Sequence, residues 1–280
     1  MKKFVFALMA AALLAASGAA FAAYPEGPIT VVVPYGAGGA MDVLKSRNDG
    51  YKVLIFDPGP GFVTTKTNKV PFNTVKDFMM AGRQTSDVRV IAVRAGDERY
   101  ANAEQFFAYV KANPGKVNVA TPGARTDGSI SLTLLNRVGG FEMVNLPCSG
   151  ANEAKSNLLG GHVDAAGLSI SDCLPLIADK KIVVIGICDA QRNAMMPDVP
   201  TFRELGVDVV WKTSRGYGFK KGTDPEIVAY FDELIKKVSE NPDYATELKN
   251  IGCPVDYLGR EEYTKYVEQN LATIAEILNK

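Results

Sequence analysis

A chain of 280 residues is long enough for one large α/β domain or for two smaller lobes, each with a sizeable apolar core. The 31 basic residues balance the 31 acidic ones, so no basic excess is available to neutralise nucleic-acid phosphates. We therefore expect no nucleic-acid partner.

The first 22 residues predict an export signal. Lys2 and Lys3 precede an apolar stretch at residues 4–14, and Ala20-Phe21-Ala22 supplies the small residues that signal peptidase prefers. The apolar stretch is too short for a membrane span, which needs roughly 20 apolar residues, and no later run approaches that length. No cysteine stands at the cleavage point to accept lipid. We expect a mature chain from residue 23 onwards that is soluble in the periplasm.

The Gly-rich segment at residues 34–42 is the strongest local indication of a binding site. It lies between a predicted buried strand at 29–33 and a predicted helix start, where free backbone N–H groups suit an anion such as a carboxylate. Glycine allows a ligand to approach the backbone, although a tight turn alone also needs glycine. The candidate ligand-binding residues here are Tyr35, Gly36, Ala37, Gly38, Gly39 and Asp42.

Two specific nucleotide-binding motifs do not match this segment. Met41 stands where the dinucleotide fingerprint needs its last glycine, and Ala40-Met41 stands where the phosphate loop needs Lys followed by Ser or Thr. We therefore expect no nucleotide cofactor, and no other cofactor is indicated. Asp42 has a simpler alternative role as an acid in the first turn of a helix.

Further apolar runs rich in β-branched residues alternate with segments of helical spacing. Amphipathic helices are predicted at 103–112, 129–138, 225–239 and 260–278, with Asp224 as the N-cap of the third. This alternation predicts an α/β architecture with parallel sheets. The remaining predicted strands are 53–56, 88–93, 117–120, 182–187 and 207–211.

A second loop, at residues 121–129, joins a predicted strand to a predicted helix in the same way. Hydroxyl groups, a guanidinium and free N–H groups gather there, which favours anion binding. Thr126 and Ser129 have the alternative role of capping the helix. The candidate ligand-binding residues of this loop are Thr121, Gly123, Arg125, Thr126 and Ser129.

Two further candidates come from polar segments later in the chain. Arg215 offers the bidentate geometry that grips a carboxylate, although an Arg on a loop is commonly just solvated. Ser169, together with Ser171, either lines a pocket or satisfies the local backbone. The sequence leaves both alternatives open.

An enzymatic function finds little support in the sequence. His162 is the single histidine, so no histidine pair exists for a metal, and the nucleophile elbow Gly-x-Ser-x-Gly is missing. The remaining enzymatic hypothesis is a periplasmic hydrolase that pairs Ser169 or Ser171 with His162. A turn histidine with ordinary hydrogen bonds is the simpler interpretation.

The four cysteines, at 148, 173, 188 and 253, are widely spaced and lack a Cys-x-x-Cys pair. Export permits disulfides, and four cysteines allow three complete pairings. Buried thiols that pack as small apolar groups are the alternative.

Several segments together resemble the Bug family of tripartite tricarboxylate transporter receptors. They are residues 29–42, Leu158-Leu159-Gly160-Gly161-His162-Val163-Asp164, Pro197-Asp198-Val199-Pro200-Thr201-Phe202, and Arg215-Gly216 before Gly222-Thr223-Asp224-Pro225. The resemblance implies a two-lobed type II periplasmic binding-protein fold, each lobe a mostly parallel sheet flanked by helices. It implies that residues 23–95 and 219–280 form the first lobe and 96–218 the second.

The resemblance also implies a function without catalysis or metal. The protein is expected to be a monomer that closes on a small di- or tricarboxylate and presents it to membrane permease subunits. In the family the loops at 35–42 and 121–129 hold the carboxylate, while Ser169 and Arg215 fall where ligand choice varies. Leu168 and Ser169 stand where some relatives carry an acid, which argues against an amino-acid ligand. The alternative is a ligand-loaded component for a sensor kinase.

One departure from the family pattern lies at residues 44–47. There the family continues its first helix and adds a strand and a second Gly-rich turn before the Asn-Asp-Gly-Tyr stretch that stands here at 48–51. A parallel crossover needs at least about 10–12 residues, and this segment barely supplies them. The first lobe is therefore expected to be reshaped, and a truncated family member without function is a further alternative.

Overall fold

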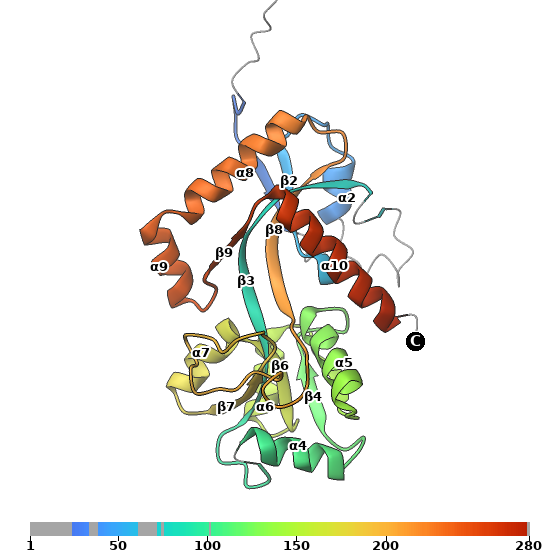
Figure 1. The fold of residues 1–280 in the computed structure, drawn as a ribbon, viewed down its shortest axis with the longest axis vertical. Helices are drawn as coiled ribbons and strands as arrows, with labels where there is room; N and C mark the ends of the chain where they lie inside the picture. Colours follow the sequence, from blue (N-terminus) through green and yellow to red (C-terminus); the bar gives the residue numbers. More distant parts are fainter. Residues whose placement is uncertain (1–23, 34–38, 61–71, 74–75, 101, 279–280) are drawn as a thin grey trace, which may run out of the picture.

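The computed structural model describes residues 24–33, 39–60, 72–73, 76–100 and 102–278. Two groups of helices and strands lie at opposite ends of a long strand, β3 (Phe78–Arg94), with β8 (Lys212–Lys220) beside it (Figure 1). The first half of β3 pairs with β8 and β9, and its second half pairs with β6 and β7. One continuous strand therefore belongs to both lobes.

Lobe 1 contains the strands in the order β1-β2-β8-β3, with β9 also paired to β3. β1 and β2 are parallel, while β8 runs antiparallel to both β2 and β3. The elements of lobe 1 besides β3 and β8 are β1 (Thr30–Val32), α2 (Gly39–Leu44), β2 (Lys52–Phe56), α8 (Pro225–Ser239), α9 (Pro242–Asn250), β9 (Val255–Leu258) and α10 (Arg260–Leu278).

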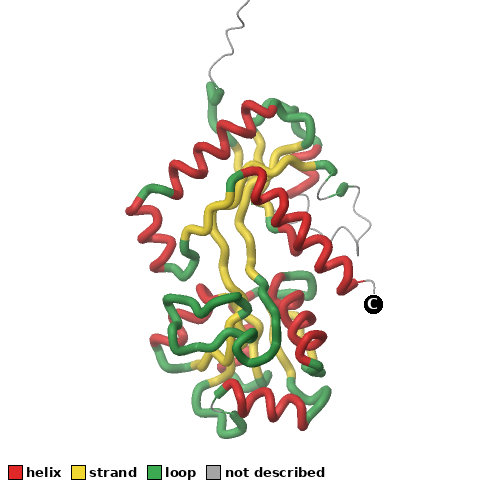
Figure 2. Tube along the Cα trace, viewed as in Figure 1, coloured by secondary structure: helices red, strands yellow, loops and turns green. Residues whose placement is uncertain are grey.

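Lobe 2 contains the second half of β3 and the order β3-β6-β4-β5, with β7 on the other side of β3. β4 is parallel to β5 and β6, and helices lie around the sheet (Figure 2). Its elements are α4 (Ala103–Ala112), β4 (Asn118–Thr121), α5 (Asp127–Gly139), β5 (Val144–Pro147), α6 (Ala151–Leu159), β6 (Ala165–Ser169), α7 (Ile170–Ala178) and β7 (Ile182–Ile187).

The predicted helices are confirmed, three of them with their predicted bounds. Asp224 caps α8 by accepting a hydrogen bond from the backbone N–H of Glu226. The predicted strand at 207–211 is wrong: the stretch has no regular secondary structure, and only Trp211 at its end exchanges backbone hydrogen bonds with Arg89 of β3 and with Cys188. Its apolar residues Val207, Val209 and Trp211 are buried in the core of lobe 2 instead, which explains the strand-like pattern.

The connection from β1 to the parallel strand β2, which was expected to be short, contains the six-residue helix α2. Val43 on this helix is fully buried in a core with Leu54 and Phe56 of β2. The turn after α2 is followed at once by β2, which pairs with β1 from Thr30 to Val32. Val31 and Val33 remain 45% and 56% exposed, so part of the apolar surface of β1 is left uncovered.

Helix α10 connects the cores of the two lobes. Tyr263 and Val267 pack in the lobe 1 core with β2 and β3, whereas Ile274 is buried in the core of lobe 2. The C-terminal part of α10 lies beside α5 (Figure 1), and Arg137 Nη1 donates to the Glu276 carbonyl at 3.0 Å. The two lobes are thus in contact at their side as well as through β3 and β8.

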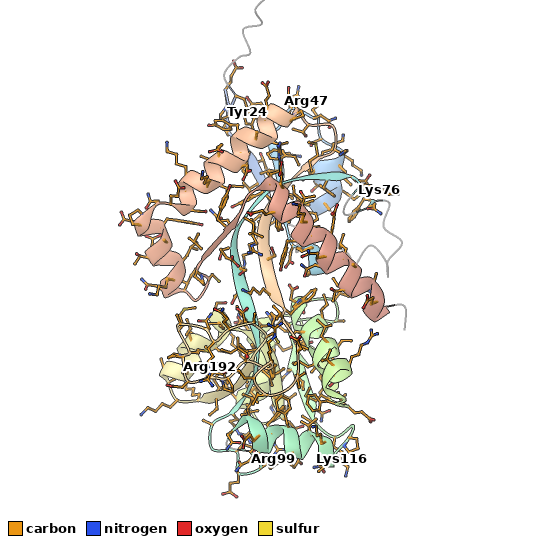
Figure 3. The ribbon with its side chains drawn as sticks, viewed as in Figure 1. Tyr24, Arg47, Lys76, Arg99, Lys116 and Arg192 are labelled. Carbon is orange, nitrogen blue, oxygen red and sulfur yellow. The ribbon has the colours of Figure 1, made fainter. Side chains whose placement is uncertain are left out.

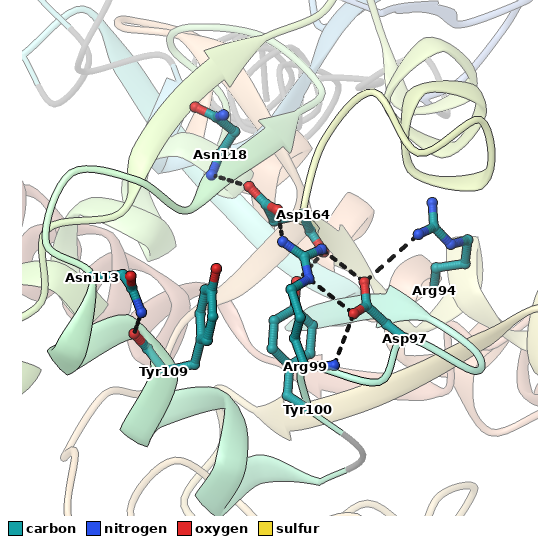
Figure 4. A network of polar contacts seen from close by, with 8 residues as sticks. All are labelled: Arg94, Asp97, Arg99, Tyr100, Tyr109, Asn113, Asn118 and Asp164. Carbon is teal, nitrogen blue, oxygen red and sulfur yellow. Dashed lines mark hydrogen bonds and ion pairs between the residues drawn. The ribbon is translucent and has the colours of Figure 1, made fainter.

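An ion-pair network around Arg99 (Figure 4) lies at the outer end of lobe 2, away from the junction between the lobes (Figure 3). Arg99 lies between Asp97 and Asp164, and Asp164 also accepts a hydrogen bond of 2.8 Å from the Asn118 backbone. Lys116, at the same end, is exposed to solvent (Figure 3). These charges stabilise the entry into β4 and β6 and do not reach the junction.

The cysteines are all free thiols, and three of them are buried. Burial raises the pKa of Cys173 and Cys188 above the ordinary thiol value. This agrees with the packing alternative rather than with disulfides.

Gly216 tests the packing of α10 on β8. A side-chain carbon at this position would lie 2.2 Å from the ring of the fully buried Tyr263. Gly216→Ala is expected to cost about 1–3 kcal/mol of unfolding free energy through overpacking, which lowers the melting temperature by roughly 2–10 °C. Gly150→Ala is the control, because nothing lies within 4 Å of a side-chain carbon there. Equal melting temperatures of the two variants would contradict this packing.

Candidate functional site

The carboxyl ends of strands from both lobes meet at one junction. β2 ends at Phe56, β4 at Thr121 and β6 at Ser169; the loop at 122–126 leads from β4 into α5, and α7 begins directly after β6. A side-chain carbon at Gly59, after β2, would lie 2.6 Å from Asp127 Oδ1 at the start of α5. In α/β folds ligands bind at the carboxyl ends of the strands, so this junction is the candidate site.

Most of the first predicted loop lies outside the described residues. Tyr35, Gly36, Ala37 and Gly38 belong to that part. Gly39 begins α2, and Asp42 is an exposed acid in the first turn of this helix. The binding role of all six residues stays a prediction.

The second predicted loop is held by its own hydroxyl groups. Ser129 Oγ lies 2.9 Å from Thr121 Oγ1 and accepts a hydrogen bond of 3.0 Å from Asn145 Nδ2. Thr126 Oγ1 donates to the Gly123 carbonyl at 3.0 Å and accepts no hydrogen bond from the first turn of α5. The hydroxyl groups therefore shape the loop, and Thr126 leaves the start of α5 without a side-chain cap. Arg125 is exposed.

Ser169 is engaged at the start of α7. Its hydroxyl group donates to Asp172 Oδ2 at 2.7 Å and lies 3.0 Å from Ser171 Oγ. The hydroxyl group and the Asp172 carboxylate form a capping box, which is the local-backbone alternative. Ser169 thus lies at the junction, but its polar group serves the helix.

Arg215 belongs to a buried cluster around Asp87 that sequence reasoning missed. Asp87 on β3 is fully buried and accepts a hydrogen bond of 2.5 Å from Ser171 Oγ. Arg215 Nη2 lies 3.6 Å from Asp87 Oδ2, and Cys253 Sγ lies 3.4 Å from the same oxygen. Burial, followed by the charge of Asp87, raises the pKa of Cys253 to about 11. Asp87 therefore orients Arg215, whose side chain keeps 38% of its surface exposed.

A second acidic group at the junction was also missed. Asp57 directly follows β2, and its two carboxylate oxygens are buried. Burial, then the charge and the hydrogen bond of Asp127, raise the pKa of Asp57 well above its ordinary value, while Arg215 lowers it. Trp211 Nε1 donates to Asp127 Oδ1 at 2.9 Å.

A cavity of about 300 Å³ opens beside this junction, between α10, β9 and residues 210–212. Its basic groups are already paired: Arg83 Nη2 lies 2.7 Å from Asp256 Oδ1, and Lys212 Nζ lies 3.1 Å from Asp189 Oδ2.

The hydrolase hypothesis is not supported by the geometry. His162 is an exposed turn residue before β6, and Ser169 ends that strand. At about 3.3 Å per residue, β6 alone places Ser169 roughly 13 Å from Ala165, and His162 lies three residues further back in the turn. In the described part of the chain no group of His, Cys, Asp or Glu side chains forms a metal site.

Three acids, Asp57, Asp87 and Asp127, are the functional candidates that the sequence analysis did not single out. Asp87 follows the polar run Arg83-Gln84-Thr85-Ser86 in the middle of β3 and is fully buried, and Asp57 directly follows the apolar strand β2. An acid in either position is unusual unless it has a partner. The partners come from residues 70 or more positions away, and no local pattern predicts them.

The family model described as "Tripartite tricarboxylate transporter family receptor" matches residues 28–280. The UPF0065 protein in the gbd 5' region of Cupriavidus necator is 27% identical, over 92% of this chain and 88% of the relative. That alignment runs over 293 positions, of which this chain fills about 258 (92% of 280), so about 35 positions of the relative have no counterpart here. This agrees with a shortened segment.

Two solved structures from Rhodopseudomonas palustris share the fold. Rpa4515 with adipate has a TM-score of 0.78 and 18% identity, covering 91% of this chain and 97% of its own. MatC with bound malate has a TM-score of 0.74 and 24% identity, covering 86% of this chain and 85% of its own. These likenesses support the two-lobed periplasmic binding-protein fold. In the described residues, no helix is long and apolar enough to span a membrane.

Asp87→Asn tests whether the buried cluster stabilises the junction. The change keeps the shape but removes the charge that faces Arg215 and accepts from Ser171, and hydrogen bonds to a charged group contribute about 1.5–3 kcal/mol. The melting temperature is expected to fall by roughly 3–10 °C. Asp208→Asn is the control, because its ion pair with Arg203 is exposed and should contribute little. If Asp87→Asn and Asp208→Asn had the same melting temperature, this stabilising role of Asp87 would be refuted.

Proposed function

We propose, from the premise that this chain belongs to the tripartite tricarboxylate transporter receptor family of non-enzymatic periplasmic solute-binding proteins, that it captures a small di- or tricarboxylate at the lobe junction. It would then present the ligand to the permease subunits of a tripartite tricarboxylate transporter. In this proposal, residues 1–22 direct export and the mature chain acts as a monomer.

The observation that carries the proposal is the start of α5 at the junction. This helix has 13 residues, and the Thr126 side chain accepts none of the hydrogen bonds of its first turn. Backbone N–H groups at a helix start favour an anion through hydrogen bonds and the helix dipole. A carboxylate placed there would lie where the two lobes meet.

Arg215 provides a second attraction for an anion. It lies on β8, which pairs with β2 and β3, and Asp87 holds its guanidinium at the junction. A guanidinium can hold a carboxylate through two parallel hydrogen bonds. The helix start and Arg215 together suit a ligand with two anionic ends.

The related structures support the ligand class. One holds adipate and the other malate, and both ligands are dicarboxylates. This chain shares their fold, and we carry over the class of ligand but not its identity. The lobe division at 23–95 with 219–280 and at 96–218 is retained as a proposal, with two changes: β3 is shared by both lobes, and β8 (Lys212–Lys220) pairs in the sheet of lobe 1.

A thermal melt of residues 23–280 with di- and tricarboxylates tests the proposal. A ligand at about 100 times its dissociation constant adds roughly 2.7 kcal/mol, which raises the melting temperature by several degrees. Arg215→Gln should weaken binding about tenfold or more, because it removes a charge-assisted hydrogen bond. Arg192→Gln, at an exposed ion pair with Glu204, is the matched control.

The dimethyl esters of the same acids should produce no shift, since they lack the negative charge. A cooperative melt that no di- or tricarboxylate shifts would exclude the proposed function. Equal affinity of Arg215→Gln and the control would remove Arg215 from the site.

A further inference from the structure

Arg89 is a charged residue inside the apolar half of β3. Its neighbours Val88, Val90 and Ile91 belong to the buried cores of lobe 2, and Arg89 itself is only 5% exposed. Arginine is almost never buried to this extent in a protein unless its charge is paired. The group that neutralises this charge therefore defines what Arg89 does.

The guanidinium of Arg89 lies against the start of α5. Its Nη2 donates to the Gly167 carbonyl of β6 at 2.8 Å. A side-chain carbon at Gly128, the second residue of α5, would lie 2.9 Å from the same nitrogen. Because glycine stands there, the guanidinium can approach the backbone of the first helical turn.

Arg89 forms no ion pair with any residue that the structure describes. Its hydrogen-bond acceptor, the Gly167 carbonyl, is neutral, and its buried Nε has no acceptor among these residues. The segments outside the described ranges contain no Asp or Glu in their sequence, so they supply no acidic side chain either. The chain thus leaves the charge of Arg89 without a counter-ion.

The two acids nearest to Arg89 in the fold are engaged elsewhere. Asp87 lies two residues earlier on β3, and its Oδ2 lies 3.6 Å from Arg215 Nη2. Asp127 is the first residue of α5, and its Oδ1 accepts from Trp211 Nε1 at 2.9 Å. Neither carboxylate forms an ion pair with Arg89 in the structure.

The helix start beside Arg89 also lacks partners for its N–H groups. The Ile130 N–H donates to the Thr126 carbonyl at 3.0 Å, which is the first hydrogen bond of the helix. The N–H groups of residues 127–129 therefore have no acceptor within α5. An unpaired buried cation and the positive end of a helix dipole both favour an anion, and here they lie side by side.

We propose that Arg89 is the counter-charge for a carboxylate group that binds at the start of α5. The inference rests on the proposed function, because it assigns the cation that lobe 2 contributes to the same site. Arg125, the arginine of the loop before α5, is exposed to solvent. The buried arginine on the neighbouring strand takes the role that the sequence analysis gave to Arg125.

Arg89 and Arg215 together fit a ligand with two carboxylates. Arg215 stands opposite Thr85 in the sheet, and Arg89 follows four residues later on β3. At about 3.3 Å per residue, the two attachment points are roughly 13 Å apart along the strand. Asp87 lies between them and partly neutralises Arg215, so we expect Arg89 to contribute more to affinity than Arg215 does.

The affinity for malate, adipate and citrate tests the assignment. Arg89→Met removes the charge and keeps an unbranched side chain, and it should weaken binding about 10- to 100-fold. The melting temperature without ligand should stay equal or rise, because the variant loses a buried cation that has no counter-ion. Arg94→Met on the same strand is the matched control, since Arg94 is 39% exposed and pairs with Asp97. The control should keep the wild-type affinity.

Acetate separates this assignment from the proposed function, because it carries a single carboxylate group. At high concentration it should raise the melting temperature of the wild type and not that of Arg89→Met. If malate, adipate and citrate do not bind but acetate shows this difference, the proposed function fails and the anion site at Arg89 stands. If none of the four stabilises the wild type, the site at Arg89 is overturned as well.

Wild-type affinity in folded Arg89→Met would overturn the proposal even if malate binds. A lower melting temperature without ligand, combined with unchanged affinity, would give Arg89 a structural role through the Gly167 carbonyl and overturn it equally. Far-UV circular dichroism verifies that the variant is folded. If Arg89→Met does not fold, Arg89→Gln removes the charge but keeps a donor for that carbonyl, and the same comparison of affinities decides.

Discussion

The continuity of β3 through both sheets is the constraint on which the arrangement of the molecule depends. A strand of 17 residues pairs on one half with β8 and β9 and on the other with β6 and β7, so its backbone groups are satisfied in both lobes. Because the sheet is shared, the carboxyl ends of β2, β4 and β6 are brought to one junction. Asp87 lies on β3 near the change of partners, which places its charge at the centre of that junction.

Some groups at the junction favour a bound anion, and others repel it. The start of α5 and the guanidinium of Arg215 favour an anion, while Asp57, Asp87 and Asp127 oppose it. Asp87 is compensated by Arg215, Ser171 and Cys253. For Asp57, burial and the charge of Asp127 raise its pKa, while Arg215 and the Gly59 backbone lower it.

The sequence predicts the elements that carry their own local signals. α8 and α10 have their predicted bounds because the capping residue Asp224 and the apolar spacing define them. β8 was missed because its Thr-Ser-Arg-Gly-Tyr-Gly segment lacks β-branched apolar residues and pairs by tertiary contacts on both sides. The stretch at 207–211 was mistaken for a strand, since apolar alternation reports burial and not hydrogen bonding.

In the candidate site, too, some features have a local sequence signal and others do not. Loops between a strand and a helix are visible in the sequence, and both Ser169 and Arg215 lie at the junction, where their binding role stays a prediction. The approach of Gly59 to Asp127 and the pairing of Arg215 with Asp87 join residues far apart in the chain. Such contacts depend on how the lobes meet, and a single sequence carries no local pattern for them.

The placement of Ile274 has a consequence for the time a ligand would stay bound. This residue is anchored on α10, whose preceding turns are fixed in lobe 1, yet its side chain is buried in the core of lobe 2. Any separation of the lobes that carries α10 with lobe 1 exposes Ile274 to water at a cost of about 1.5–3 kcal/mol. That cost makes the separated form roughly ten- to hundredfold rarer, at about 1.4 kcal/mol per factor of ten. The residence time of a captured solute would therefore be governed in part by an apolar side chain that never touches it.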